Sequence, residues 1–482
     1  MSFGTAAKGW CYNTCITFEE SARMNKSLFH FVVAVALGGF LFGFDSGVIS
    51  GCEKAIQNEF ALAALWHGLI IAGALIGTVI GVFTAGAPSD RWGRRWALWA
   101  MGVLFLVSAV GCALTPRSIA WGPHVLGWFR FVGGLAIGGV SVVVPLYIVE
   151  LAPGHLRGRL VAVNQLNIVF GIVVSYVSNY LVARYVHADP GVVWRVMLGV
   201  ECVQIALFMA LLPTIPESPR WLVRVNREDE ARRVLERVGY PNVVQTLKEI
   251  RESLSSLVNS DIRTSRHSDN PEVLFQRRYL KPILLAFFIA FFNQMSGINA
   301  INYYAPRIFQ MIFGEGSELA ALVGTIGVGA VNLVFTALAF LVIDRFGRRI
   351  LIIGGSAVMI AMHGLVAWQL SQPHPNAALA VAGILGFIAF FAISSGAVIW
   401  VYISEVFPNV VRAKGQALGC FTHWFLCMFV SWFFPVVAER AGMYAFAFFA
   451  FMMAVQLVWA VCFMPETKGG TIEDIERRLE RN

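Results

Sequence analysis

Long apolar runs alternate with short polar segments along almost the whole chain. The apolar runs are continuous, and each is roughly 20 residues long, which is the length that a helix needs to cross a bilayer. Strands are a poor alternative, because a backbone exposed to lipid must satisfy its own hydrogen bonds. The pattern therefore predicts an all-α membrane protein with about twelve spanning helices, near 28–50, 67–88, 96–115, 122–149, 160–184, 194–214, 281–306, 318–343, 350–371, 378–404, 415–438 and 442–464.

A polar stretch in the middle of the chain separates the first six runs from the last six. In it, 227–238 is charged and amphipathic, and a second helix is expected at 242–257. We expect these helices to cap the interface between the two halves; a plain linker is the alternative. The predicted parts are an N-terminal tail, a six-helix bundle, a helical linker, a second six-helix bundle and a C-terminal tail, at 1–27, 28–215, 216–280, 281–464 and 465–482.

Three charged motifs occur twice in the same order, about 250 residues apart. The first and second copies are Asp90–Arg95 and Asp344–Arg349, Glu150–Pro153 and Glu405–Pro408, and Pro216–Pro219 and Pro465–Lys468. Each copy stands at the end of an apolar run, so the two halves are homologous. Internal repeats of membrane segments are typical of transporters that place a binding site between two rocking bundles, a pseudo-symmetric arrangement.

Composition agrees with a membrane location, since 57% of the residues are hydrophobic and 14% are charged. Most Lys and Arg fall in the tails and in alternate loops, which predicts a multi-pass protein of the plasma or inner membrane with both termini cytoplasmic. That bias also accounts for the net charge of +8.

Without a basic aromatic patch we expect no nucleic-acid partner. The eight cysteines form no CxxC pair, so we expect no metal and no cofactor. Without a nucleophile–base pair in the polar segments, we expect no enzyme.

Asp45 lies inside the first apolar run, and Arg130 is the only basic residue well inside a run. Ionisable groups in membrane segments are costly and usually functional, so we expect these two to pair. A carboxylate beside a cation stays ionised, whereas one left in apolar surroundings takes up a proton. The pair is thus a candidate for proton coupling; a static ion pair is the alternative. Glu201, near Arg195, either joins this pair or faces water.

The repeated motifs predict a network of charges in short turns on one face of the membrane. Such a network could latch that face while the other opens, whereas a topology signal alone needs only Lys and Arg. Its candidate members are Asp90, Arg94, Glu150, Arg157, Asp344, Arg348, Glu405 and Arg412.

Polar side chains within the apolar runs form a third group. Amides both donate and accept hydrogen bonds, which suits sugar hydroxyls, although a lone Asn more often bonds a neighbouring helix. Gln294 and Asn299 are five residues apart, so they share a helix face only if the helix breaks near Gly297. Other members of the group are Gln165, Asn293, Asn332, Trp400, His423 and Trp424.

From about Gly38 to Glu466 the chain resembles the sugar porter family of the major facilitator superfamily. The matching strings are Gly-Gly-Phe-Leu-Phe-Gly-Phe-Asp (38–45), Asp-Arg-Trp-Gly-Arg-Arg (90–95), Pro-Glu-Ser-Pro-Arg-Trp-Leu (216–222), Gln-Met-Ser-Gly-Ile-Asn (294–299), Tyr-Tyr (303–304), Asp-Arg-Phe-Gly-Arg-Arg (344–349), Ser-Glu-Val-Phe-Pro (404–408) and Pro-Glu-Thr-Lys-Gly (465–469). The resemblance implies twelve helices, alternating access and a monosaccharide substrate. An aspartate at position 45 is closer to proton-coupled members, such as xylose or hexose symporters, than to facilitative carriers.

The resemblance also implies which residues contact sugar or form gates. The implied sugar contacts are Phe42, Gln165, Asn293, Gln294, Asn299, Asn332, Trp400, His423 and Trp424. The resemblance adds Glu217, Arg220, Tyr303 and Tyr304 to the residues of the charged network that are expected to form gates. Four positions depart from the family pattern, namely Asn293, Ile172, His423 and Ala397, so the pocket is a variant one. His423 either responds to pH near neutrality or serves as a neutral hydrogen-bonding group.

These observations predict proton-coupled symport of a monosaccharide, a hexose or a pentose, by a monomer in a lipid bilayer. The alternative is a facilitative uniporter in which Asp45 and Arg130 are only structural. A sugar receptor that signals without transport is less favoured.

Overall fold

The computed structural model describes residues 26–154, 156–267, 274–314, 316–408, 411–440 and 442–468. For 256–267, Asp344, Ala413, Glu439 and Arg440 the description covers the backbone only. Most of the predicted N-terminal tail, much of the predicted C-terminal tail and the Asp344 side chain therefore lie outside the described part of the chain.

Twelve helical segments of the described chain are long and apolar enough to cross a membrane. The first six are α2 (Lys26–Glu59), α3 (Ala64–Thr84), α5 (Arg94–Ala113), α6 (Gly122–Leu151), α7 (Arg157–Tyr185), and α8 (Pro190–Gly199) with α9 (Glu201–Leu211) and η1 (Leu212–Thr214). The last six are η2 (Arg277–Tyr279) with α13 (Leu280–Met295) and α14 (Ile298–Phe313), then α15 (Glu318–Phe346), α16 (Arg348–Ser371), α17 (Ala377–Ile393) with α18 (Ser395–Glu405), α19 (Arg412–Arg440) and α20 (Gly442–Cys462). The chain is thus a multi-pass membrane protein.

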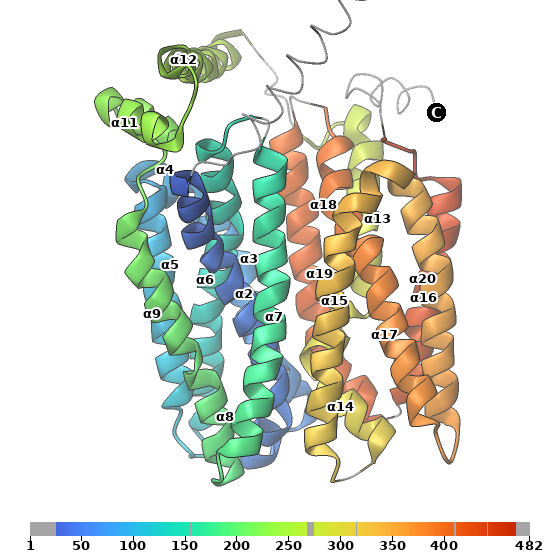
Figure 1. Ribbon diagram of the computed structural model, residues 1–482. Coiled ribbons are helices and arrows are strands. Elements are labelled where there is room, and N and C mark those ends of the chain that lie inside the picture. Colours follow the sequence, from blue (N-terminus) through green and yellow to red (C-terminus); the bar gives the residue numbers. More distant parts are fainter. Residues whose placement is uncertain are drawn as a thin grey trace, which may run out of the picture.

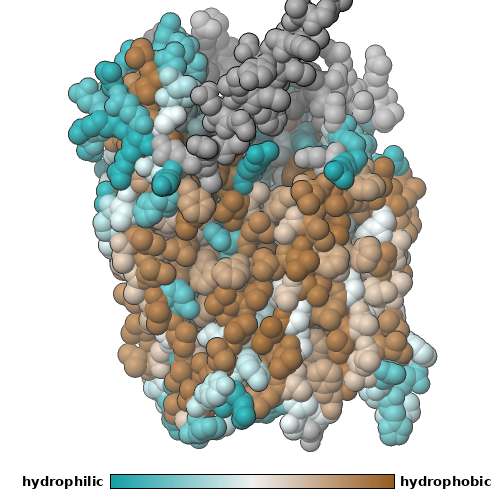
Figure 2. Space-filling view, viewed as in Figure 1, coloured by the Kyte–Doolittle hydropathy of each residue, from teal (hydrophilic) through white to brown (hydrophobic). Residues whose placement is uncertain are grey.

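Figure 1 shows the first six spans, in blue to green, beside the last six, in yellow to red. The linker helices α10 (Pro219–Arg224), α11 (Glu228–Val238) and α12 (Val243–His267) lie at one end of the spans, which we call the linker side. The opposite end, where α8 and α14 lie, is called the far side. Hydrophobic residues cover the middle of the face in Figure 2, and hydrophilic ones gather at both ends, as a bilayer requires.

Close helix packing inside the first half depends on glycine. A Cβ on Gly43 of α2 would lie 1.9 Å from the backbone oxygen of Ile168 in α7. A Cβ on Gly134 of α6 would lie 1.9 Å from the backbone oxygen of Ala74 in α3. Neither helix pair could approach as closely with a larger residue. The halves meet where α3 packs on α19, α7 on α15 and α2 on α14.

The linker helices differ from the expectation in two respects. The apolar face of α11, with Ala231 and Val234, packs into the core of the first half, so it caps that half and not the interface between halves. Phe31 of α2 belongs to the same core, and the Arg237 guanidinium of α11 lies over its ring at 4.9 Å. The second linker helix was expected to end at 257 but continues to His267.

Candidate functional site

Asp45 of α2 and Arg130 of α6 form an ion pair in the interior of the first half. Arg130 Nη1 donates to Asp45 Oδ1 at 2.7 Å, and the side chains are 2% and 1% exposed. Asp45 Oδ2, Arg130 Nε and Arg130 Nη2 have no hydrogen-bond partner among the described residues. A buried pair with unused hydrogen-bonding capacity gains less than a fully bonded one, so it is less costly to separate.

Glu201, at the start of α9, is buried and interacts electrostatically with both Asp45 and Arg130. Its neighbour in sequence, Arg195, instead forms an ion pair with Glu59 at 2.8 Å. The sequence left the place of Glu201 open, and the structure puts it beside the buried pair. This buried group therefore contains two carboxylates and one guanidinium.

A tyrosine connects this charged group to the second half. Tyr303 of α14 is 5% exposed, and its hydroxyl is within hydrogen-bonding reach of Ser46, the residue after Asp45. A movement of α14 away from α2 would therefore break this contact next to Asp45.

The seventh span breaks at Gly297, as its sequence predicts. Gly297 has φ +82°, and a Cβ on it would lie 2.5 Å from the Phe449 ring. The break brings the two amides together, because Asn299 Nδ2 donates to Gln294 Oε1 at 2.7 Å. His363 of α16 lies 3.0 Å from the backbone oxygen of Ser296 and so supports the break from a neighbouring helix.

Gln294 is the centre of a cluster of amides. Its Nε2 lies 3.1 Å from Asn293 Oδ1 and 3.0 Å from His423 Nδ1. Asn293 Nδ2 in turn donates to the backbone oxygen of Ser395 at 3.0 Å. Gln294 Nε2 also lies 3.3 Å from His423 Nε2, and because an amide nitrogen only donates, a hydrogen bond between the two side chains requires an unprotonated ring nitrogen on His423.

Aromatic rings line one side of this cluster. The His423 ring lies 4.8 Å from Trp400 and 5.1 Å from Trp424, between ring centres. Trp424 reaches Phe42 of the first half at 5.6 Å. The aromatic members of the predicted sugar site are thus in contact across the two halves. Rings of this kind offer flat apolar surfaces next to hydrogen-bonding amides.

Two further predicted contacts lie outside this contact group. Gln165 is half-buried on α7, and Asn332 is buried on α15, where its Oδ1 accepts from Thr336 Oγ1 at 3.3 Å.

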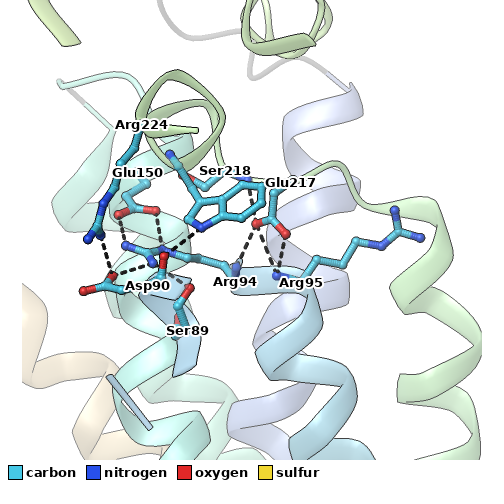
Figure 3. A network of polar contacts seen from close by, with 9 residues as sticks. Ser89, Asp90, Arg94, Arg95, Glu150, Glu217, Ser218 and Arg224 are labelled. Carbon is cyan, nitrogen blue, oxygen red and sulfur yellow. Dashed lines mark hydrogen bonds and ion pairs between the residues drawn. The ribbon is translucent and has the colours of Figure 1, made fainter. Parts of the chain in front are cut away.

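The first copy of the charged motifs forms one network on the linker side (Figure 3). Arg94 donates to both carboxylate oxygens of Glu150, at 2.9 and 3.0 Å, and to Asp90 Oδ1 at 2.6 Å. Glu217 accepts from the backbone N–H groups of Arg94 and Arg95, at 2.9 and 3.1 Å. The third motif therefore caps the N-terminus of α5, where the helix dipole favours an anion.

The second copy repeats this arrangement in the second half. Arg348 donates to both oxygens of Glu405, at 2.9 and 3.2 Å. Glu466 accepts from the backbone N–H groups of Arg348 and Arg349, at 2.9 and 3.0 Å. A Cβ on Gly347 would lie 2.6 Å from Glu466 Oε2, so glycine is required for this cap. Glu466 was not among the predicted site residues, although the repeated Pro-Glu motif could have identified it.

The other predicted members of the network have different partners. Arg157 and Arg412 donate to backbone oxygens, of Ala152 at 3.2 Å and of Phe407 at 3.4 Å. Arg220 donates to Ser253 Oγ of α12 at 3.0 Å.

The two capping carboxylates differ electrostatically. Burial raises the pKa of Glu217, and hydrogen bonds from the backbone of Ser218, Arg95 and Arg94 offset only part of that effect. Burial also acts upward on the pKa of Glu466, but four backbone N–H groups outweigh it, so the pKa is lowered. The folded protein therefore favours the ionised form of Glu466 more than the ionised form of Glu217.

Comparison with known proteins gives consistent matches over the chain. The family described as "Sugar (and other) transporter" matches residues 31–479. The D-xylose-proton symporter of Escherichia coli (strain K12) is 34% identical over 95% of this chain and 97% of its own length. The arabinose-proton symporter of Bacillus subtilis (strain 168) is 35% identical over 92% of this chain and 93% of its own length. A solved structure described as the inward open conformation of the xylose transporter XylE from E. coli has a TM-score of 0.82 and 32% identity, covering 94% of this chain and 99% of that one.

Proposed function

The chain belongs to the sugar (and other) transporter family, and from that premise we propose that it carries a monosaccharide together with a proton by alternating access. The buried pair of Asp45 and Arg130 is the observation that supports proton coupling most directly. The two relatives named above are both described as proton symporters of a pentose, so a pentose or a hexose is the proposed substrate.

The amide cluster and its aromatic rings are the proposed sugar site. Gln294, Asn299 and His423 supply donors and acceptors from α13, α14 and α19, while Trp400 and Trp424 supply flat apolar faces. Gln165, Asn293, Asn332 and Phe42 complete the proposed contacts.

Coupling follows from the connection between this site and the buried pair. If bound sugar moves α14 towards the site, Tyr303 moves with that helix. Tyr303 interacts with the side chain of Ser46, which is next to Asp45. A shift that parts Asp45 from Arg130 leaves a carboxyl in apolar surroundings, where the protonated form is favoured. Re-forming the pair expels the proton. Proton movement and the change of access are thereby linked.

The proposed orientation places the linker side in the cytoplasm of the cell, with both termini there, because basic residues concentrate in the segments on that side. We also propose that the protein acts as a monomer in the plasma or inner membrane, that it needs no cofactor, and that it has no enzyme activity.

Replacement of Asp45 tests the proposal. In proteoliposomes with an imposed proton gradient, Asp45→Asn should abolish uphill sugar accumulation while sugar exchange down a gradient continues. The matched control is Glu59→Gln, which removes a carboxylate of the same helix that pairs with Arg195 at 2.8 Å and touches no proposed sugar contact. The control should still accumulate sugar. If Asp45→Asn also accumulates sugar, the coupling proposal is wrong.

Proton flux separates symport from facilitated uniport. Sugar added to vesicles in a weakly buffered solution should alkalinise the outer solution if a proton enters with each sugar. A uniporter gives sugar entry with no pH change. A competition panel of pentoses, hexoses and polyols in the same vesicles identifies the substrate.

A further inference from the structure

A second group of buried charges lies on the far side, where α2, α3 and α14 meet. Arg307 Nε of α14 lies 3.3 Å from Glu53 Oε1 of α2, and His67 Nε2 of α3 lies 3.4 Å from Glu53 Oε2. The side chains of Glu53, His67 and Arg307 are 1%, 0% and 13% exposed. The carboxylate thus meets an imidazole of its own half and a guanidinium of the other half.

Polar contacts on both sides of this group also join the halves. Arg307 donates to Gln57 Oε1 of α2. One turn along α14, Gln310 Oε1 accepts from Lys54 Nζ at 2.5 Å. Glu53, Lys54 and Gln57 therefore form one face of α2 that meets Arg307 and Gln310 on α14.

Aromatic residues enclose the group. The Tyr304 ring lies 6.2 Å from the His67 ring, and the Tyr304 hydroxyl donates to the backbone oxygen of Ser431 at 2.9 Å. Trp432 Nε1 donates across the halves to the backbone oxygen of Leu65 at 3.1 Å. The Glu53 carboxylate is 1% exposed beside them.

The pair exists only while the far side is closed. If the halves separate there, Arg307 leaves with α14, while Glu53 and His67 stay in the first half. A buried carboxylate that loses its cation is left as an unpaired charge, so Glu53 must be hydrated when the pair breaks. An interaction made in one conformation and absent from the other shifts the equilibrium between them by its whole free energy.

We propose that Glu53 and Arg307, with His67 against the second carboxylate oxygen, form an ion-pair latch that holds the far side closed. The latch rests on the proposed alternating access but not on proton coupling through Asp45. It acts on the balance between the two open conformations, and it contacts no proposed sugar residue. Glu53, His67 and Arg307 therefore affect transport through the conformation of the protein and not through contact with the sugar.

The latch is tested by measuring the separation of the halves directly. Spin labels on Ser118→Cys and Ser371→Cys, two exposed far-side positions of the first and second half, report that separation in a background without the native cysteines. Glu53→Gln and Arg307→Gln should each raise the ratio of far-side-open to far-side-closed protein about tenfold, equivalent to about 1.4 kcal/mol. The double variant should shift it no further than either single one, and Arg307→Lys should shift it less than Arg307→Gln.

The control is Glu59→Gln, since Glu59 and Arg195 form an ion pair within the first half alone. It should leave the distance distribution unchanged. The latch is refuted if neither neutral variant shifts the distribution, if the shifts of the two variants simply add, or if the control shifts it equally. The measurement needs neither sugar nor a proton gradient, so its failure would leave the test of symport intact, and the reverse also holds.

Discussion

Gln294 has the largest number of partners in the amide cluster. One side chain contacts Asn293, Asn299 and His423. In this arrangement its carbonyl accepts and its NH₂ group donates, so both ends of the amide are oriented. A sugar hydroxyl that binds here meets a group already fixed in direction, which reduces the entropy lost on binding.

Gln294→Ala should therefore weaken sugar binding about tenfold or more, since a lost hydrogen bond that leaves buried partners unpaired costs about 1–3 kcal/mol. Calorimetric titration of the purified protein with the sugar it transports measures the change. Gln204→Ala is the control, because Gln204 is a half-buried amide of α9 away from the cluster. Equal affinity of the Gln294 variant and the unaltered protein would remove Gln294 from the sugar site.

At the scale of elements, α5 and α16 begin in the same way. Each starts after a glycine with positive φ, Gly93 at +103° and Gly347 at +88°, and each has a carboxylate from a distant motif on its first N–H groups. The repeated motifs are therefore parts of one helix-capping unit, present once in each half. The unit fixes the linker-side ends of four spans within each half, because Arg94 and Arg348 also hold Glu150 and Glu405.

The two caps should differ in their dependence on pH. Glu466 has a lowered pKa, so its contribution to stability is present above the unfolded pKa of about 4.3 and is lost as pH falls through the folded value. Glu217 has a raised pKa, so its ionised form is disfavoured by folding, and its contribution improves as pH falls. Near neutral pH, Glu466→Gln should therefore cost more than Glu217→Gln, by about 1 kcal/mol, the usual scale of a helix cap.

Thermal unfolding in detergent from about pH 4 to about pH 8 measures this difference, with the unaltered protein as reference. The deficit of Glu466→Gln should shrink towards the acid end of the range. A larger loss for Glu217→Gln near neutral pH would contradict the assignment of the two carboxylates.

For the whole molecule, polar contacts close the far side between the halves. Lys54 with Gln310, Arg307 with Glu53 and Trp432 with Leu65 all join the first half to the second there. The linker-side motif contacts described above, by contrast, each stay within one half. Under the proposed orientation, this distribution corresponds to a protein that is closed on the outside.

Holding the far side closed should stop transport. A short bifunctional cross-linker between Lys54→Cys and Gln310→Cys should abolish sugar uptake, and cleavage of the linker should restore it. The control pair is Arg117→Cys with Asp189→Cys, which replaces a far-side ion pair of 3.4 Å within the first half. Uptake should survive that cross-link. Sugar uptake is measured in vesicles. If uptake persists when the first pair is cross-linked, the far side need not open for transport.

Much of this protein could be predicted from local patterns. Continuous apolar runs specify spanning helices because lipid leaves the backbone no other partner, and the repeats specify two halves. Asp45 and Arg130 could be paired because a charge inside an apolar run needs a partner of opposite sign, although the place of Glu201 stayed open. A break near Gly297 was the condition under which Gln294 and Asn299, five residues apart, could share one helix face, and the glycine itself made that break plausible.

Tertiary packing decided what no local pattern encodes. Arg195 is close to Glu201 in sequence, yet it pairs with Glu59, because α8 packs against the end of α2. The cap of α11 on the first half and the meeting of Glu53 with Arg307 also join residues from separate helices. Hydrophobic periodicity specifies where a helix lies relative to lipid, but partners across a bundle depend on how helices are rotated and arranged. That arrangement arises only when all the spans pack together.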